Sequence, residues 1–480
     1  MLSKDSTDDY TDLLEMIQIK KILIAGLIIY ALFYLIESLI IIKYPYQISY
    51  PEGFILNQAY LLSQGELIYK GINEYPYLIV NYPPIYPFLC AIFIKLFGIS
   101  FVSGRFITFL ASILIVSIIY KILKRQISQN IAIISALLFV SSSYIYKCNP
   151  FFRVDMLGLF FSLLGLYFFF QNNKLTIPIL CFLAALYTKQ TFIGAPLAVA
   201  IFLFLTNKKR AFIFVVFMVF FYTIILLLIN YFTHGEFYKH NFLYNLNIFI
   251  FKQAMKHYIW ALQNHAILVL FSLVYIFYSF ANKKFSVLVI YFIISCIITI
   301  SVGKIGANMN YFFEMIALAC ILTGFCLEKL KNDIDEKIYN YLSTGAILIQ
   351  LILFLHMPYL TEPTATKLTW ENSKKLSEIV VNTKGEIISE DAGLLVKNGK
   401  TVLFQPFEFT QLANQKIWNQ TRFINDIKNK RFTLIILSFD LNCQVDEERL
   451  TPEMAEAIKE NYSANQKIDE YFLYQPIIQD

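Results

Sequence analysis

The stretch ILIAGLIIYALFYLIESLIII, residues 22–42, decides the class of fold. A spanning α-helix needs about 20 mainly apolar residues, and this run is long enough to cross a bilayer. Lys20 and Lys21 precede it, and no small-residue cleavage site follows it. We therefore expect an uncleaved first span with the N-terminal segment, residues 1–21, in the cytoplasm.

The composition extends this interpretation to most of the chain. Of the 480 residues, 57% are hydrophobic, 17% aromatic and only 15% charged, whereas soluble domains carry roughly 25% charged residues. The mean hydropathy is +0.57. These values exclude an ordinary cytosolic enzyme, a disordered chain and a small disulfide scaffold. Apolar runs predict a polytopic α-helical membrane protein with about eleven spans.

The basic residues indicate orientation. The net charge of +6 comes from 40 Lys and Arg against 34 Asp and Glu, but the basic residues lie mostly in short loops between apolar runs. By the positive-inside rule such loops are cytoplasmic, so the charge does not indicate a nucleic-acid partner. The segment 82–98 is short and rich in proline, and we predict an interfacial helix on the outer leaflet. The alternation then places these segments outside: 43–104, 144–153, 233–258, 303–310 and everything after 356.

The C-terminal part differs in composition. From about residue 361 charged residues become frequent, and short β-rich runs alternate with helical stretches. We therefore predict a membrane domain at 22–358, with a first outer loop at 43–104, and a small extracytoplasmic α/β domain at 359–480. Glu390 and Asp391 are interpreted as charges at a strand end. The predicted elements are strands at Glu386–Ser389, Thr401–Phe404 and Phe432–Phe439 and a helix at Pro452–Asn461.

Two acids stand at the outer ends of apolar helices. No P-loop, GxGxxG, HExxH or GxSxG motif occurs. The remaining candidates are ionisable residues at membrane depth, which are costly and usually functional. Glu52 follows Pro51 in the first outer loop, and Asp155 opens the apolar run RVDMLGLFFSLLGLYFFF at 153–170. Either acid is also explained as a helix cap.

Cations lie on the same predicted face. Lys189 interrupts the apolar surroundings of LYTKQTF, residues 186–192, and Lys304 lies in SVGKIGANMNYFFEM, residues 301–315, near Asn310 and Glu314. Arg153 precedes Asp155 by two residues. Lysines at helix ends often only extend to the interface, so each one alone is a weak signal.

Together these residues suit sugar transfer from a polyprenyl-phosphate donor. An inverting displacement needs one carboxylate to take the proton from the acceptor hydroxyl. The departing lipid phosphate is already an anion, so cations serve it better than a general acid. We predict that the carboxylates of Glu52 and Asp155 open into one outer cavity with Lys189 on its wall.

The order of motifs resembles the GT-C integral-membrane glycosyltransferases. The motifs are the first outer loop with Glu52, NYPPIYPFL at 81–89, GRFITFLASILIVSIIYKILKR at 104–125, the run at 153–170 and TKQTFIGAP at 188–196. The branch containing protein O-mannosyltransferases, the aminoarabinose transferase of lipid A and Rgt-type transferases is the most similar. The resemblance implies a GT-C-like fold and a lipid-phosphate sugar donor.

The resemblance also implies roles for individual residues. That family usually carries Asp-Glu in the first outer loop; here the pair is Pro51-Glu52, so the aspartate is missing and Glu52 or Asp155 is left as the base. Lys189 resembles a lysine that contacts the donor phosphate, and Arg105 matches an arginine that opens the second span. We add Arg153 and Lys304 as phosphate ligands and Asn310, Glu314 and Tyr82 as secondary residues on the acceptor side.

Other functions remain open from the sequence. The main alternative is a lipid-linked saccharide transporter or flippase, although transporters tend to carry charges near the midplane and inverted repeats. A receptor needs fewer spans, and an O-antigen-type polymerase or ligase would differ only in its acceptor. The acceptor is a glycan, a lipid or a protein. No cofactor is indicated, and a divalent metal is left open. The richness in Ile, Lys, Asn, Tyr and Phe indicates an AT-rich genome, and we expect a bacterial plasma membrane rather than an endoplasmic reticulum.

Overall fold

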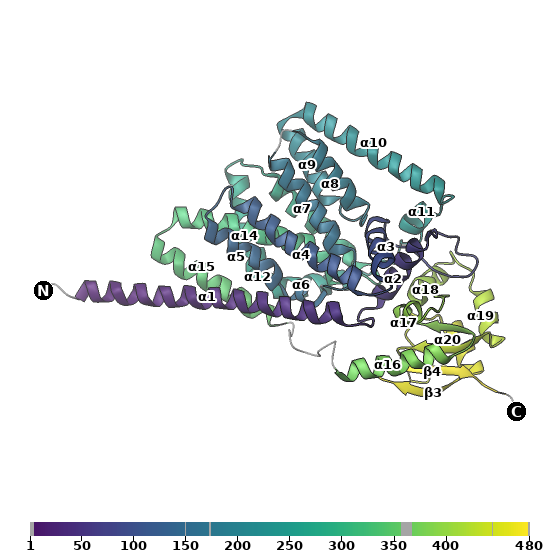
Figure 1. Cartoon of the computed structure of the whole chain (residues 1–480). Coiled ribbons are helices and arrows are strands. Elements are labelled where there is room, and N and C mark those ends of the chain that lie inside the picture. Colours follow the sequence, from purple (N-terminus) through teal and green to yellow (C-terminus); the bar gives the residue numbers. More distant parts are fainter. Residues whose placement is uncertain (1–3, 149, 172–173, 357–366, 444, 479–480) are drawn as a thin grey trace.

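The computed structural model describes residues 4–148, 150–171, 174–356, 367–443 and 445–478. It contains a bundle of helices and, beside one end of that bundle, a small domain with a β-sheet (Figure 1). The N-terminus lies at the far end of helix α1 (Lys4–Lys43), and the C-terminus lies in the small domain at the opposite end of the molecule. This arrangement agrees with the predicted polytopic helical fold and its small α/β domain.

Six helices of the described residues are long and apolar enough to cross a membrane, and five shorter apolar helices besides α3 pack among them. The six long helices agree with the predicted polytopic helical protein, and the five shorter ones would have to span as well to reach the predicted number of about eleven. The predicted first span is part of α1, which continues without interruption from the N-terminal segment. The other helices of the bundle are α4 (Val102–Leu123), α5 (Gln129–Ser141), α6 (Ser143–Cys148), α7 (Asp155–Gln171), α8 (Thr176–Leu186), α9 (Gly194–Thr206), α10 (Lys208–Phe232), α12 (Phe251–Ala281), α13 (Val287–Thr299), α14 (Phe313–Asp333) and α15 (Glu336–Phe354).

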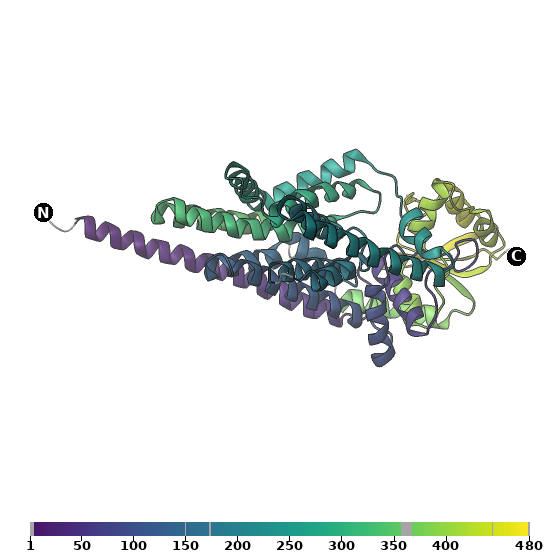
Figure 2. The same ribbon diagram turned by 90° about the horizontal axis from the view of Figure 1, so that it is seen from above.

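The first outer loop contains two helices, α2 (Tyr50–Ser63) and α3 (Ile85–Phe97). In the view from above, α3 runs across the direction of the long helices (Figure 2). Its exposed face carries Phe88, Ile92 and Leu96, spaced four residues apart, so an apolar stripe points away from the protein. An exposed apolar stripe on a short transverse helix supports the predicted interfacial position.

The C-terminal domain contains a mixed four-stranded sheet in the order β1-β2-β4-β3. The strands β1 (Glu386–Ser389) and β2 (Phe432–Leu437) are parallel, whereas β4 (Tyr471–Pro476) pairs antiparallel with β2 and with β3 (Tyr462–Ile468). The helices are α16 (Lys367–Asn382), α17 (Ala392–Lys397), α18 (Pro406–Asn414), α19 (Thr421–Lys428) and α20 (Pro452–Asn461). The predicted domain boundary at 358/359 lies outside the described residues.

One predicted strand is wrong. Residues 401–404 form no strand of the sheet, and Phe404 makes a single bridge with Tyr77 of the first outer loop. Tyr77 N donates to Leu403 O at 2.8 Å, and Gln405 N donates to Tyr77 O at 3.0 Å. The β-prone residues at 401–404 therefore pair with the outer loop instead of with the domain's own sheet.

The same contact region joins the two parts of the molecule. Tyr77 packs with the aromatic rings of Phe409 and Trp418, at centroid distances of 5.5 Å and 5.0 Å. Beside it, α2 and α17 approach so closely that a Cβ on Gly53 would lie 2.2 Å from Gly393 N. The C-terminal domain is therefore docked against the first outer loop. This docking places α18 beside one end of the bundle.

Candidate functional site

A cavity of about 580 Å³ lies between one end of the bundle and the C-terminal domain. Its wall comes from the first outer loop, the segments before α7 and α9, the segments at 241–247 and 301–311, and two segments of the C-terminal domain. Four cationic side chains line it: Arg153, Lys189, Lys304 and Arg449. Two carboxylates, Glu408 and Glu448, also line it, so the cations outnumber the acids on the wall, which favours an anionic ligand.

Asp155 holds two of these cations in position, although its own side chain does not line the cavity. Lys189 Nζ lies 2.7 Å from Asp155 Oδ1, and Arg153 Nε lies 3.5 Å from Asp155 Oδ2. Asn310 Nδ2 donates to the same Oδ1 at 2.9 Å. Asp155 opens α7 but is only 2% exposed and is not among the residues that line the cavity.

Aromatic rings complete the surroundings of Lys189. Its ammonium lies 4.6 Å from the ring centroid of Tyr311 and 5.7 Å from that of Tyr82, distances at which cation–π attraction operates. Lys189 is therefore held by a carboxylate on one side and by aromatic faces on another, which fixes its ammonium at the cavity wall.

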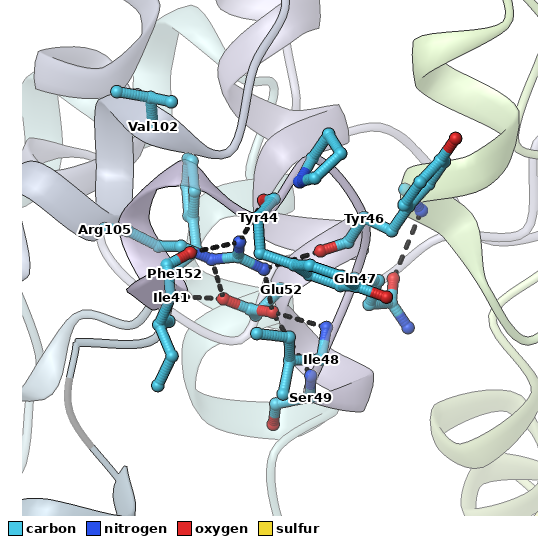
Figure 3. Close-up of polar contacts among 12 residues, drawn as sticks. Ile41, Tyr44, Tyr46, Gln47, Ile48, Ser49, Glu52, Val102, Arg105 and Phe152 are labelled. Carbon is cyan, nitrogen blue, oxygen red and sulfur yellow. Dashed lines mark hydrogen bonds and ion pairs between the residues drawn. The ribbon is translucent and has the colours of Figure 1, made fainter. Parts of the chain in front are cut away.

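Glu52 forms a saturated, buried ion pair (Figure 3). Arg105 Nε donates to Glu52 Oε1 at 2.9 Å, and Arg105 Nη2 donates to Oε2 at 2.8 Å. The backbone N–H of Phe152 also donates to Oε1, and those of Ile48 and Ser49 donate to Oε2. Burial alone would raise the pKa of Glu52, but the guanidinium and the hydrogen bonds hold that pKa below its usual value.

Arg105 extends this network to the end of the first span. Its Nη1 donates to the carbonyls of Ile41 and Tyr44, and its Nη2 donates to that of Tyr46 (Figure 3). Arg105 and Glu52 are both 0% exposed. The pair thus ties the C-terminal end of α1 to α2 and α4.

The prediction that Glu52 and Asp155 open into a shared cavity is wrong. Neither acid is among the residues that line the cavity, whereas Pro51, the neighbour of Glu52, is. The physical reason is that interior donors already bind both acids: Arg105 and backbone N–H groups bind Glu52, whereas Lys189 and Asn310 bind Asp155. This geometry favours a structural role for Glu52 and Arg105 over the predicted catalytic and phosphate-binding ones.

The remaining predicted residues are divided between wall and interior. Lys189, Arg153, Lys304 and Tyr82 line the cavity. Asn310 is committed to Asp155, and Glu314 is buried and accepts a hydrogen bond from Tyr291 Oη. The structure therefore does not bring Asn310 or Glu314 to the predicted acceptor side of the cavity.

Sequence reasoning missed Glu408, which lines the cavity from the first turn of α18. Asn81 Nδ2 of the first outer loop donates to its Oε1 at 3.1 Å. Burial raises the pKa of Glu408 to about 7, although Arg449 and the hydrogen bonds lower it in part. The sequence near Glu408 offers only one local signal, Gln405-Pro406, which predicts the start of a helix. This signal cannot show that the helix lines a cavity together with a distant loop.

Arg449 was also missed. Its guanidinium lies 3.5 Å from the ring centroid of Tyr50 and its Nε lies 3.7 Å from Glu390 Oε1. Glu390 in turn accepts hydrogen bonds from Ser438 N and Oγ. Of the two acids interpreted as strand-end charges, Glu390 thus orders a cavity cation, whereas Asp391 caps α17 by accepting from Leu394 N at 2.8 Å.

No metal centre is evident in the part of the chain that the structure describes. Within those residues, no group of three or more His, Cys, Asp and Glu side chains is placed to hold an ion.

The geometry can be compared with solved structures. ArnT from Cupriavidus metallidurans bound to undecaprenyl phosphate matches with a TM-score of 0.61 at 12% identity, over 93% of this chain and 97% of that one. The chain has the fold of the GT-C glycosyltransferases. The archaeal oligosaccharyltransferase AglB from Archaeoglobus fulgidus, in complex with an inhibitory peptide and a dolichol-phosphate, shares this GT-C fold, with a TM-score of 0.57 at 12% identity over 93% of this chain and 74% of that one.

A sequence family matches part of the same fold. Residues 81–234 match the model of dolichyl-phosphate-mannose-protein mannosyltransferases, a range that includes Arg153, Asp155 and Lys189. No curated protein matches the sequence. The resemblance noted from the sequence motifs is therefore confirmed at the level of the GT-C fold.

Proposed function

We propose that this protein is a membrane glycosyltransferase that moves a sugar from a polyprenyl-phosphate donor to an acceptor on the extracytoplasmic side of the plasma membrane. The transfer inverts the configuration at the anomeric carbon of the sugar. The observation that carries the proposal is the cavity lined by Arg153, Lys189, Lys304 and Arg449 at the outer end of the bundle. A phosphate ester is the anion best suited to several cations of fixed geometry at a membrane boundary.

The charges match the needs of the leaving group. Breaking the bond between the sugar and the lipid phosphate places growing negative charge on the phosphate oxygens, and preordered cations stabilise that charge. Lys189 and Arg153 are held in place by Asp155, so little reorganisation is needed when the charge develops. Asp155 in this scheme is a positioning residue.

Exposed apolar side chains lie beside the cavity. Leu246 lines the cavity and is exposed, and Ile248, Phe249 and Ile250 beyond it are also exposed. Helix α10 is apolar along most of its exposed length. A polyprenyl chain has matching chemistry, so these surfaces supply a path for the lipid tail while the phosphate remains at the cations.

Amide side chains suit the sugar and the acceptor. Asn81, Gln190, Asn241, Asn245 and Asn247 line the same cavity, and amides both donate to and accept from hydroxyl groups. The solved ArnT and AglB structures, which hold undecaprenyl phosphate and dolichol-phosphate respectively, support a polyprenyl-phosphate ligand for this fold. The identity of the sugar and of the acceptor is not implied by these contacts.

Binding of undecaprenyl phosphate to the purified protein in nanodiscs tests the proposal. We expect Lys189→Ala and Arg153→Ala to weaken binding at least about tenfold, because each removes a charge-assisted contact. The exposed Lys384 of the C-terminal domain lies outside the cavity, and Lys384→Ala is the matched control. Equal affinity in wild type and both cavity variants would contradict the proposed site.

A flux experiment separates the main alternative. A transporter would move a polyprenyl-phosphate sugar across a vesicle membrane with the sugar–phosphate bond intact, whereas a transferase breaks this bond. Translocation of intact donor without release of polyprenyl phosphate would favour the transporter.

A further inference from the structure

The cavity contains one carboxylate with the position expected of a proton acceptor. Its described lining residues include two acids, Glu408 and Glu448. Glu448 is exposed, whereas Glu408 is partly buried and held by Asn81. The two acids predicted from the sequence, Glu52 and Asp155, are paired with Arg105 and Lys189 and do not line the cavity.

We propose that the Glu408 carboxylate is the general base that takes the proton from the acceptor hydroxyl. The inference rests on the proposed transferase function and assigns its base to the C-terminal domain. The acceptor oxygen forms a bond to the anomeric carbon while the bond from that carbon to the phosphate oxygen breaks. The bonding electrons leave with polyprenyl phosphate, the proton moves to Glu408, and Glu408 later releases it to water.

A general base needs a carboxylate oxygen that can still accept a proton. Glu408 has such an oxygen, whereas Glu52 has none. Glu408 Oε1 accepts from Asn81, but its buried Oε2 has no hydrogen-bond partner among the described residues. Both oxygens of Glu52 are saturated. A carboxylate with free acceptor capacity binds a proton more readily than one whose charge is already neutralised by donors.

The groups that act on Glu408 come from three elements. Arg449 precedes α20, Tyr50 begins α2, and Asn81 belongs to the first outer loop. At the start of α18 itself, the backbone N–H of Glu408 and the side chain of Gln405 also act on the carboxylate. Burial opposes the charged form of Glu408, whereas these donors, Asn81 and the charge of Arg449 favour it. The resulting pKa of about 7 lies where a general base is most effective near neutral pH.

The docking of the C-terminal domain explains how a distant residue reaches this position. The backbone pairing of Tyr77 with Leu403 and Gln405 ends one residue before α18. Ile79 N also donates to Gln405 Oε1 at 3.0 Å. These bonds fix the start of α18, and with it Glu408, relative to the outer loop that carries Asn81.

Glu408→Gln tests the assignment directly because the amide preserves size and can still accept from Asn81. The assay measures release of polyprenyl phosphate from undecaprenyl-phosphate-linked hexoses and pentoses, with envelope membranes as the acceptor source. We expect a loss of at least about 100-fold in turnover, with unchanged undecaprenyl phosphate binding. The matched control is Glu456→Gln, at an exposed acid on α20 outside the cavity, which we expect to retain wild-type turnover.

The pH profile gives a second readout. Wild-type turnover should rise with pH through about 7 as Glu408 loses its proton, and Glu408→Gln should lack this limb. Asn81→Ala removes a donor that stabilises the carboxylate, so its limb should move to higher pH; this variant also decides the matter if Glu408→Gln does not fold.

The outcomes are distinct. Wild-type turnover in Glu408→Gln, or an unmoved limb in Asn81→Ala, would overturn the assignment of the base while leaving the transferase function intact. A wild-type protein that neither binds undecaprenyl phosphate nor releases it from any donor would overturn the proposed function, and the base with it.

Discussion

Glu52→Gln should destabilise the protein rather than act only on catalysis. The substitution keeps the shape of the side chain but removes the negative charge opposite a fully buried guanidinium. Removing one partner of a buried ion pair costs about 3–5 kcal/mol because the other charge is left uncompensated. Arg105 retains its bonds to the carbonyls of Ile41, Tyr44 and Tyr46, so we expect a loss of about 3 kcal/mol in the free energy of unfolding.

The assay is unfolding in mixed detergent micelles followed by tryptophan fluorescence. The matched control is Glu66→Gln in the same outer loop, where Glu66 pairs with Lys70 at 2.9 Å but is half exposed. Exposed pairs contribute little, so this control should change the free energy of unfolding by less than about 0.5 kcal/mol. Equal, small effects of Glu52→Gln and Glu66→Gln would refute the structural role assigned to the Glu52–Arg105 pair.

Three further predictions concern the cavity and the C-terminal domain. Asp155→Asn should reduce the affinity of the folded protein for undecaprenyl phosphate, because Lys189 and Arg153 lose the carboxylate that positions them; unchanged affinity in a binding titration would contradict this. Gly53→Val should increase protease sensitivity of the C-terminal domain, since a Cβ there would lie 2.2 Å from Gly393 N, and a wild-type digestion rate would count against the docking contact. Burial raises the pKa of Asp391 to about 7, so the contribution of its protonated form to stability is complete below pH about 4 and is lost as the pH rises through about 7. Asp391→Asn should therefore remove this part of the pH dependence of the free energy of unfolding. An unaltered pH profile in Asp391→Asn would contradict this prediction.

The span pattern was predictable because it depends on local properties. Apolar runs such as 22–42 indicate burial in lipid from their own length and composition, independently of distant contacts. The strands at Glu386–Ser389 and near Phe432 and the helix at Pro452–Asn461 were predictable for the same reason. The error at Thr401–Phe404 arose because its partner, Tyr77, belongs to another part of the chain.

The site was only partly predictable for a related reason. Lys189 and Arg153 were evident because a cation in apolar surroundings is costly and needs an explanation. Whether an acid faces a cavity or a guanidinium depends on tertiary packing, and the Glu52–Arg105 pair joins residues from separate helices. Glu408 and Arg449 reach the cavity only through docking of the C-terminal domain, for which the sequence carries no local signal.

The central claim is that the cationic outer cavity is where the bond between a sugar and a polyprenyl phosphate breaks. The most direct measurement is the initial rate of polyprenyl phosphate release from undecaprenyl-phosphate-linked sugars by wild type, Lys189→Ala and Lys384→Ala, each at the same protein concentration in nanodiscs. The account predicts release by wild type and Lys384→Ala and at least about a tenfold lower rate for Lys189→Ala. Equal rates in all three proteins, or no release by any of them, would contradict it.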